Sequence, residues 1–494
     1  MLNYLIFFPL IVAFVVLCLN RGGVKFFSVL ASLMILGLNL KIFYDYLVFE
    51  NSFEFKLPFK LLNFFSYHIG VDSIALSLMI LCSLMIFLAF IFLKVEQKSM
   101  VAAIFFLEFA IMGLFSSLDA LLFYIFWEFS LLPLIFIIGV YGKEYIIGLK
   151  FFIYAFAGSI LMLVSMVYLA YLNYQLLGIW TFDIEIWKNN VSAASFTQQL
   201  ILFCAFFFAF AIKAPLFPVH TWAPKVYANS PILVSVMLVA FKMSPFGFLR
   251  FCLPLFPDAS VYFLPMIASF CILSILYTAF IAFKADDLRE LIAYSSISHL
   301  GIMVLGIFSF NTIGISGSIF YMFAHGIVTA ALFLLAQSLY ERYNTTSLDK
   351  LHSLAQKAPL FTLFFAIMSF ASISLPITIN FVGEFLVLLG IAKLHIIYGL
   401  FAGLIVILGA IYMLYVLRKI CFMQEKSSLI NFSLHSREII ALIPMVCLVF
   451  YLGISPKVLL YPIEKDVDKI LEVMNIRAVE QDTINFLHAL GASK

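Results

Sequence analysis

The chain of 494 residues contains a succession of apolar stretches, each long enough to cross a lipid bilayer. A spanning helix needs about 20 mostly apolar residues, and about fourteen such stretches follow one another here. Strands of a membrane barrel would be far shorter, and an open sheet would leave unpaired peptide groups in lipid. The sequence therefore predicts an all-α polytopic membrane protein. The expected spans lie near residues 3–20, 25–48, 73–95, 99–116, 119–140, 149–174, 198–215, 229–252, 260–283, 290–309, 314–340, 360–390, 394–420 and 438–455.

The composition agrees with this class. Hydrophobic residues make up 65% of the chain and charged residues only 11%, whereas a soluble domain has about 25% charged residues. We therefore expect the lipid bilayer to surround the protein, and we expect no nucleic acid among its partners. The seven cysteines form no CxxC pair and no Cys/His ligand spacing, so we expect small core residues rather than disulfides or a metal site.

Lysine and arginine gather in alternate loops between the expected spans. By the positive-inside rule, the odd-numbered loops face the cytoplasm, and an even number of helices places both termini outside it. The even loops hold only Lys56, Lys60, Lys188, Arg250 and Lys393. The odd loops hold Arg21, Lys25, Lys94, Lys98, Lys143, Lys150, Lys225, Lys284, Arg289, Arg342, Lys350, Lys357, Arg418, Lys419, Lys426 and Arg437.

The order of the spans suggests an internal repeat. Five spans fall within 99–252 and five within 253–425, and proline interrupts the later half of each block, at Pro215 and Pro218 and then at Pro376. Because a five-helix unit has an odd number of spans, the second copy must enter the membrane from the opposite side. This is the inverted-repeat plan of transporters with broken helices. We divide the chain into N-terminal helices (1–98), these two repeats, and a last helix with a C-terminal tail (426–494).

Five ionisable side chains lie inside apolar runs: Glu128, Lys213, Lys242, His299 and Glu384. A charge at mid-bilayer costs roughly 3 kcal/mol on insertion scales, so such residues usually persist for a function. Acids, amines and an imidazole alternate along the chain, which predicts a path for protons.

Glu128 and Lys213 form the first candidate pair. Burial disfavours the charged form of either group, while contact between them favours both charged forms. A conformational change that opens or closes the pair would therefore move a proton. The alternative is a static ion pair that locks two helices together.

Lys242 has apolar neighbours on both sides, which argues against a lysine that snorkels to the interface. His299 and His325 carry side chains suited to proton transfer near neutral pH. Both could instead be core histidines or haem ligands, although Ser295, Ser296 and Ser298 favour a hydrated stretch around His299. Glu384 follows Asn380 and Gly383, which are small or polar residues beside which water could be admitted.

Four further residues are weaker candidates. Lys41 could face a partner subunit, and Glu108 could be a further relay member or a buried structural residue. We expect Asp119 to cap a helix and His220 to close a re-entrant turn. The segment after Ser455 has apolar residues at helical spacing between charges, which predicts an amphipathic helix on the outer surface or on a neighbouring subunit.

Six sequence motifs, taken in their order along the chain, resemble those of the antiporter-like subunits of respiratory complex I. Among these subunits, they resemble the M type most closely. The resemblance covers roughly residues 99 to 425 and the SLHSRE segment after them, and it is specific because six spaced motifs agree. The strings are FWEFSLLPLIFIIGVYG, KFFIY, AIKAPLFPVHTWAP, LIAYSSISHLG, AHGIVTAALFLLAQSLYER and NFVGEF.

The resemblance implies roles for six residues. Glu128 and Lys213 would form the pair of the first half-channel, Lys242 would be the central lysine, and Glu384 the exit residue. His299 and His325 would connect them. A glutamate at 384 is what the M type carries where its sister subunits usually have lysine.

Two departures from the family pattern stand out. The usual Trp-Leu-Pro-Asp-Ala-His reads Trp222-Ala223-Pro224-Lys225-Val226-Tyr227 here, which puts a proton-entry role for this turn in doubt. The run from Ser235 to Lys242 is about two residues short, or about 200° of helix. Lys242 therefore keeps its role only if a bulge or a shifted start restores the helical phase.

The resemblance implies a proton-translocating subunit of an NADH:quinone oxidoreductase. We expect this chain to bind no cofactor, and NADH or another donor, flavin, iron–sulfur clusters and quinone to belong to partner subunits. The expected partners are membrane subunits, especially the L and N types, in a bacterial inner membrane. A sodium/proton antiporter or a membrane-bound hydrogenase on the same fold, and a scaffold with frozen ion pairs, are the alternatives.

Overall fold

The computed structural model describes residues 1–49, 53–62, 65–94, 97–190, 194–423 and 430–474. The N-terminal part contains α1 (Leu2–Cys18), α2 (Arg21–Phe49), β1 (Phe53–Leu62), β2 (Phe65–Val71) and α3 (Ser73–Phe92). The next part contains α4 (Lys98–Ser116), α5 (Ala120–Phe129), α6 (Leu131–Tyr141), α7 (Tyr145–Leu177), α8 (Ile184–Asn189), α9 (Phe196–Lys213), α10 (Ala223–Asn229), α11 (Ile232–Ala240), α12 (Met243–Gly247), the π-helical turn η2 (Phe248–Cys252) and α13 (Leu253–Leu255).

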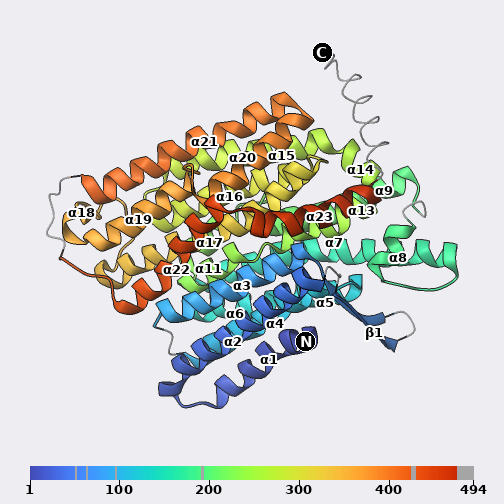
Figure 1. Cartoon of the computed structure of the whole chain (residues 1–494), viewed down its shortest axis with the longest axis horizontal. Coiled ribbons are helices and arrows are strands. Elements are labelled where there is room, and N and C mark those ends of the chain that lie inside the picture. The colour runs from blue at the N-terminus through green and yellow to red at the C-terminus, as the bar shows by residue number, and fades with distance from the viewer. Residues whose placement is uncertain (50–52, 63–64, 95–96, 191–193, 424–429, 475–494) are drawn as a thin grey trace.

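The third part contains α14 (Pro257–Tyr262), α15 (Leu264–Lys284), α16 (Leu288–Ile307), α17 (Thr312–Tyr343), α18 (Leu354–Lys357), α19 (Pro359–Ser372), α20 (Ile379–Leu394), α21 (Ile396–Leu417) and the π-helical turn η3 (Arg418–Phe422). The chain ends with α22 (Ser436–Ile454) and α23 (Lys457–Val473). Figure 1 shows one helical bundle, with α1 and α2 at one edge and α21 at the opposite edge.

The predicted helical membrane class is confirmed. Within the described residues, 12 helical segments are long and apolar enough to span a membrane. The shorter apolar helices α1 and α19 fall below that length, and α19 is followed by α20 after a break. The count of fourteen spans therefore stays a prediction.

A β-hairpin joins α2 to α3 and was not among the expected elements. Strands β1 and β2 pair antiparallel, with irregular register between Phe55 and Phe59 and again between Lys60 and Leu62. The alternation of apolar and charged residues in Phe53-Glu54-Phe55-Lys56 has the period of two that favours a strand. The hairpin lies at one end of the bundle, where lipid does not forbid strands (Figure 1).

Loops of the same parity meet at the same end of the bundle. At one end, Leu118 N–H donates to the His68 carbonyl at 3.0 Å and Ala120 N–H donates to the Phe182 carbonyl at 2.8 Å, which joins three even-numbered loops. At the other end, Lys143 N–H donates to the Asn229 carbonyl at 3.1 Å, which joins two odd-numbered loops. The Lys/Arg asymmetry of the sequence therefore separates two real faces of the molecule.

Several helical paths are interrupted in the interior. Helix α9 ends at Lys213 before a turn that leads to α10, and residues 373–378 separate α19 from α20. Between α11 and α12 the chain leaves helical geometry at Phe241 and Lys242. The Ala240 carbonyl beside this break accepts a hydrogen bond from the Cys82 thiol, with Sγ 3.7 Å away. Lys213 and Lys242 thus lie at such breaks, whereas His299, His325 and Glu384 lie within helices.

Helix α17 runs through the centre of the bundle. An 18-residue stretch of it is completely buried, whereas comparable stretches of α7 and α21 are 39% buried. Helix α17 packs against α3, α11, α16, α19, α20, α22 and α23. It is therefore enclosed by protein, while α7 and α21 expose apolar surface.

The amphipathic C-terminal helix is confirmed, but its apolar side packs on this same chain, against α3 and α17. The Asp466 carboxylate of α23 accepts hydrogen bonds from the Tyr46 hydroxyl at 2.6 Å and from Ser73 N–H at 2.8 Å. These contacts tie α23 to α2 and to the start of α3. The helix thus lies at the even-loop end of its own chain, and the expected contact with a neighbouring subunit stays a prediction. Figure 1 shows α23 lying across the bundle.

A buried ion pair at the odd-loop end gives a test of stability. Arg342 Nη2 lies 2.6 Å from Glu438 Oε2, and the Glu438 side chain is 0% exposed. Arg342→Ala would leave this carboxylate without its cation, which costs about 3 kcal/mol in buried pairs. We expect a lower thermal midpoint of the purified complex, measured by calorimetry. Lys419→Ala is the matched control, since its partner Asp349 is exposed, and an equal loss in both variants would contradict this account.

Candidate functional site

Glu128 and Lys213, the first candidate pair, lie close to each other but are not in contact. Lys213 Nζ donates to Ser130 Oγ at 2.9 Å and lies 3.9 Å from the centre of the Trp127 ring. Glu128 is near enough to act on Lys213 electrostatically, yet among the described residues no ion pair within 4.0 Å joins them. Oε1 of Glu128 is buried without a hydrogen-bond partner in that same part of the chain. The structure therefore holds this pair in a separated arrangement.

Lys242 lies at the break between α11 and α12 and points into the bundle. Its side chain is buried, and Nζ lies 3.1 Å from His325 Nδ1. The two missing residues before Lys242 do not displace it, because the helix is interrupted at residues 241–242 and a π-helical turn follows. The break removes the requirement for a continuous helical phase.

The two histidines lie beside each other. The ring centres of His299 on α16 and His325 on α17 are 5.6 Å apart. His299 Nδ1 lies 2.7 Å from the Tyr321 hydroxyl, and that hydroxyl lies 3.2 Å from Glu384 Oε2. Ser374, at the break between α19 and α20, also donates to Glu384 Oε2. Tyr321 therefore connects the histidines to Glu384.

The sequence interpretation missed Tyr321. It lies four residues before His325 on α17, and residues four apart share one face of a helix. That spacing would have placed its hydroxyl beside the histidines. We found no comparable sequence signal for Ser374, because its role depends on where the helix breaks.

A small cavity separates the Glu128–Lys213 pair from the rest of the network. Its volume is about 30 Å³, and its wall includes Lys213, Lys242, Tyr227 and Ser244. A cavity needs roughly 10–15 Å³ of this kind of volume to hold a water molecule. The two lysines thus share a space in which water could connect them.

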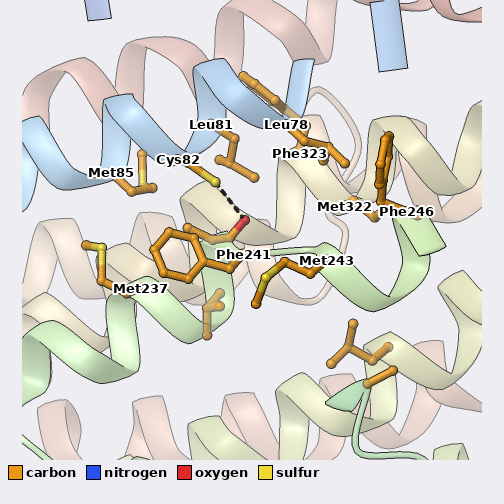
Figure 2. Packing of buried hydrophobic residues seen from close by; sticks show 14 of the residues in the cluster. Leu78, Leu81, Cys82, Met85, Met237, Phe241, Met243, Phe246, Met322 and Phe323 are labelled. Carbon is orange, nitrogen blue, oxygen red and sulfur yellow. Dashed lines mark hydrogen bonds between the residues drawn. The ribbon is translucent and has the colours of Figure 1, made fainter. Parts of the chain in front are cut away.

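The side of the break that faces α3 is apolar. Figure 2 shows Leu78, Leu81 and Met85 packed opposite Phe241 and Met243, with the Cys82–Ala240 hydrogen bond between them. This wall offers few polar groups to a water molecule. Phe241 and Met243 of this packing also line the lysine cavity.

The weaker candidates fall into different environments. Asp119 is confirmed as a helix cap, since its carboxylate accepts from Leu121 and Leu122 N–H. His220 stacks on Phe217, and Lys41 is exposed on α2. Glu108 is completely buried, and neither of its oxygens has a hydrogen-bond partner among the residues the structure describes.

Within the described ranges, no group of three or more His, Cys, Asp or Glu side chains is placed to hold a metal ion. The network instead consists of one amine, two imidazoles, a phenol, a carboxyl and a hydroxyl in sequence. Each of these groups can donate or accept a proton.

Comparisons with known proteins agree on one family. Residues 117–411 match the model described as NADH:quinone oxidoreductase/Mrp antiporter, TM. The chain is 35% identical to an NADH-quinone oxidoreductase subunit M of Rickettsia prowazekii over 94% of its length and 97% of that protein. It is 33% identical to NADH-ubiquinone oxidoreductase chain 4 of Marchantia polymorpha, over 95% of its length and 97% of that protein.

Solved structures give the same result. A chain of respiratory complex I from Thermus thermophilus with bound NADH superposes with a TM-score of 0.88 and 28% identity, covering 96% of this chain and 100% of that one. A chain of the Mrp complex from Dietzia superposes with a TM-score of 0.82 and 18% identity, over 97% and 99% of the two chains, which shows the shared fold alone. The chain belongs to the NADH:quinone oxidoreductase/Mrp antiporter family of transmembrane subunits.

Proposed function

We propose that this chain is the M-type, proton-translocating membrane-arm subunit of a complex I type NADH:quinone oxidoreductase. The observation that carries the proposal is the buried line of proton-exchanging groups from Lys242 through His325, His299 and Tyr321 to Glu384. Such a line has little structural value in an apolar bundle, because buried polar groups are costly to desolvate. Membership of this family supports the view that the redox chemistry takes place in partner subunits of the complex.

The separated Glu128–Lys213 pair is the input switch in this proposal. When the two groups approach each other, both are stabilised as ions; when they separate, Lys213 tends to release its proton into the low-dielectric interior. The cavity shared with Lys242 receives that proton. The separated arrangement seen here corresponds to the state after release.

The onward path uses groups that each accept one proton and give up another. A protonated Lys242 donates to His325, and His325 passes a proton to His299, whose ring centre lies 5.6 Å away. Tyr321 receives a proton from His299 at one side of its hydroxyl and releases its own to Glu384 at the other, with no net change. Glu384 then releases the proton to the opposite side.

The free energy needed to move one proton across the membrane is similar to the free energy that opening or closing the Glu128–Lys213 pair supplies. Moving one charge against 100 mV costs about 2.3 kcal/mol. Opening or closing one ion pair at low dielectric changes the electrostatic energy by a few kcal/mol. A conformational or electrostatic signal from a neighbouring subunit therefore suffices to drive one proton.

We further propose how the chain lies in the membrane and beside its partner subunits. We place the chain in a bacterial inner membrane, with the odd-loop face toward the cytoplasm and both termini on the other side. Residues 99–252 and 253–425 form the two inverted five-helix repeats. The L- and N-type subunits are its neighbours, and NADH, flavin, iron–sulfur clusters and quinone belong to other subunits of the complex.

The proposal is tested with Glu128→Gln in inverted membrane vesicles. Glutamine keeps the size of the side chain but cannot ionise, so we expect a clearly lower proton yield per NADH oxidised in a complex that still assembles. Proton uptake, quinone reduction and assembly are followed in one preparation. An undiminished yield would make the pair a structural clamp, and sodium-dependent exchange without an electron donor would favour an antiporter.

A further inference from the structure

A pocket at the odd-loop end of the bundle collects basic side chains. Its volume is about 250 Å³, and its wall comes from the ends of α3, α6 and α17, from the start of α11 and from α16. The wall contains three cations, Lys94, Lys143 and Arg289. Among the described residues that line it, Glu341 is the one carboxylate, and its Oε2 lies 3.0 Å from Arg437 Nη2. Because that carboxylate is already paired, the pocket carries an excess of positive charge.

Arg289 is a buried cation without a carboxylate partner. It is 5% exposed, and within the described part of the chain its guanidinium makes no ion pair within 4.0 Å. Nη2 donates instead to the carbonyls of Tyr227 at 2.8 Å and Ser230 at 2.5 Å, and Nε has no hydrogen-bond partner among the same residues. Buried charges in proteins are as a rule paired, because an isolated one is costly to desolvate. An anion in the pocket would supply the missing partner.

Neutral donors belong to the same wall. Ser230 lines the pocket and is 2% exposed, and its hydroxyl has no hydrogen-bond partner among the described residues. Ile232 and Leu233, the first two residues of α11, also line it, and no side chain caps this helix at Pro231. The first N–H groups of a helix have no partner within the helix and attract anions. The hydroxyl and the helix start therefore add hydrogen-bond donors to the charge of Arg289.

The two lysines belong to the solvent side of the pocket. Lys94 and Lys143 are both exposed, and neither makes an ion pair with a described residue. Lys143 N–H donates to the Asn229 carbonyl at 3.1 Å, and its Nζ lies 6.0 Å from the centre of the Tyr340 ring on α17. Lys94 follows the end of α3, which packs against both α11 and α17. Both amines can therefore reach an anion that is held at Arg289.

We propose that this pocket binds a phosphate-bearing anion, with Arg289 and the start of α11 at its floor and Lys94 and Lys143 at its mouth. Three cations beside a single, already paired carboxylate favour a multiply charged anion over a monovalent one. Donors from several elements suit the oxygen atoms of a phosphate group. The space admits free inorganic phosphate or the phosphate of a lipid headgroup. Binding forms only ion pairs and hydrogen bonds, and it does not depend on the proposed proton transport.

The test uses the double variant Lys94→Gln, Lys143→Gln in the purified, intact complex. It removes two charges from the mouth of the pocket and keeps the hydrogen bonds of Arg289. The lipid-depleted complex in an uncharged detergent is titrated with sodium phosphate by calorimetry, against sodium chloride of equal ionic strength. In a second arm, phosphatidylglycerol retained after its addition is counted by mass spectrometry. We expect the affinity for the bound probe to fall on the order of tenfold or more, because charge-assisted hydrogen bonds are lost.

The matched control is Lys150→Gln, Lys225→Gln. These two lysines are also exposed on odd-numbered loops, but they line a neighbouring pocket. The control makes the same change of charge at the same face of the molecule. It should therefore bind phosphate and phosphatidylglycerol as the unchanged complex does.

The two arms distinguish the sources of the phosphate group. Phosphate binding that weakens in the pocket variant and not in the control identifies a free anion, and phosphatidylglycerol that behaves in this way identifies a lipid headgroup. If the unchanged complex binds neither probe, or if pocket variant and control bind alike, the site is overturned. Should the double variant fail to assemble, Lys94→Gln alone decides by the same criterion. Binding is measured without NADH, so its failure leaves the proposed function, tested by Glu128→Gln, standing.

Discussion

Lys242→Ala is expected to abolish most proton pumping while the complex still assembles. Lys242 is the group that lies both in the wall of the lysine cavity and within hydrogen-bond distance of His325, at 3.1 Å. Alanine removes the amine that accepts the incoming proton and leaves an apolar gap before the histidines. Loss of a general acid–base group typically slows proton transfer by about 100-fold or more.

The measurement is proton uptake by inverted vesicles for each NADH oxidised, with quinone reduction and assembly as parallel readouts. Lys41→Ala is the matched control, because Lys41 is also a lysine in an apolar helix but is exposed on α2. A normal yield in Lys242→Ala would remove the central step from the mechanism. A failure to assemble, without any change in yield per assembled complex, would favour the scaffold interpretation.

Glu384→Ala is expected to have a comparable effect at the other end of the network. The Glu384 carboxyl accepts hydrogen bonds from Tyr321 and Ser374 and is the last proton-exchanging group of the line. Without it, a proton that reaches Tyr321 has no acceptor, so we expect pumping through this subunit to stop. Glu384→Gln, which keeps the side-chain volume, should give the same result.

Tyr321→Phe makes this second prediction more specific. The Tyr321 hydroxyl is 2.7 Å from His299 Nδ1 and 3.2 Å from Glu384 Oε2, so the single variant should slow pumping on its own. Residues that act in one path give non-additive effects. The Tyr321→Phe, Glu384→Gln double variant should therefore pump no worse than Glu384→Gln. Multiplied losses would show that the two residues serve separate routes.

The helical class was predictable because bilayer thickness and peptide hydrogen bonding leave few alternatives. The titratable residues were predictable for a related reason, since a charge inside an apolar run is conspicuous. The structure joins Lys242, His299, His325 and Glu384 in one network and places Lys213 across a small cavity from it. Their roles as proton carriers stay a prediction.

What the sequence could not supply depends on where helices break and which surfaces meet. The doubt about the helical phase of Lys242 arose from counting residues in a regular helix, and the break at residues 241–242 makes that count irrelevant. Tyr321 was overlooked because a tyrosine in an apolar run looks like packing. The placement of α23 followed from the hydrogen bonds of Asp466 to Tyr46 and Ser73, which lie hundreds of residues away in sequence.

The enclosure of α17 decides which parts of the molecule are free to act as moving parts. This helix carries His325 and Tyr321, is buried throughout an 18-residue stretch and is held by α23 across the bundle. Its packing on every side holds this helix in place. In the proposed route, we therefore expect the displacements that open and close the path to occur in the interrupted segments around this helix.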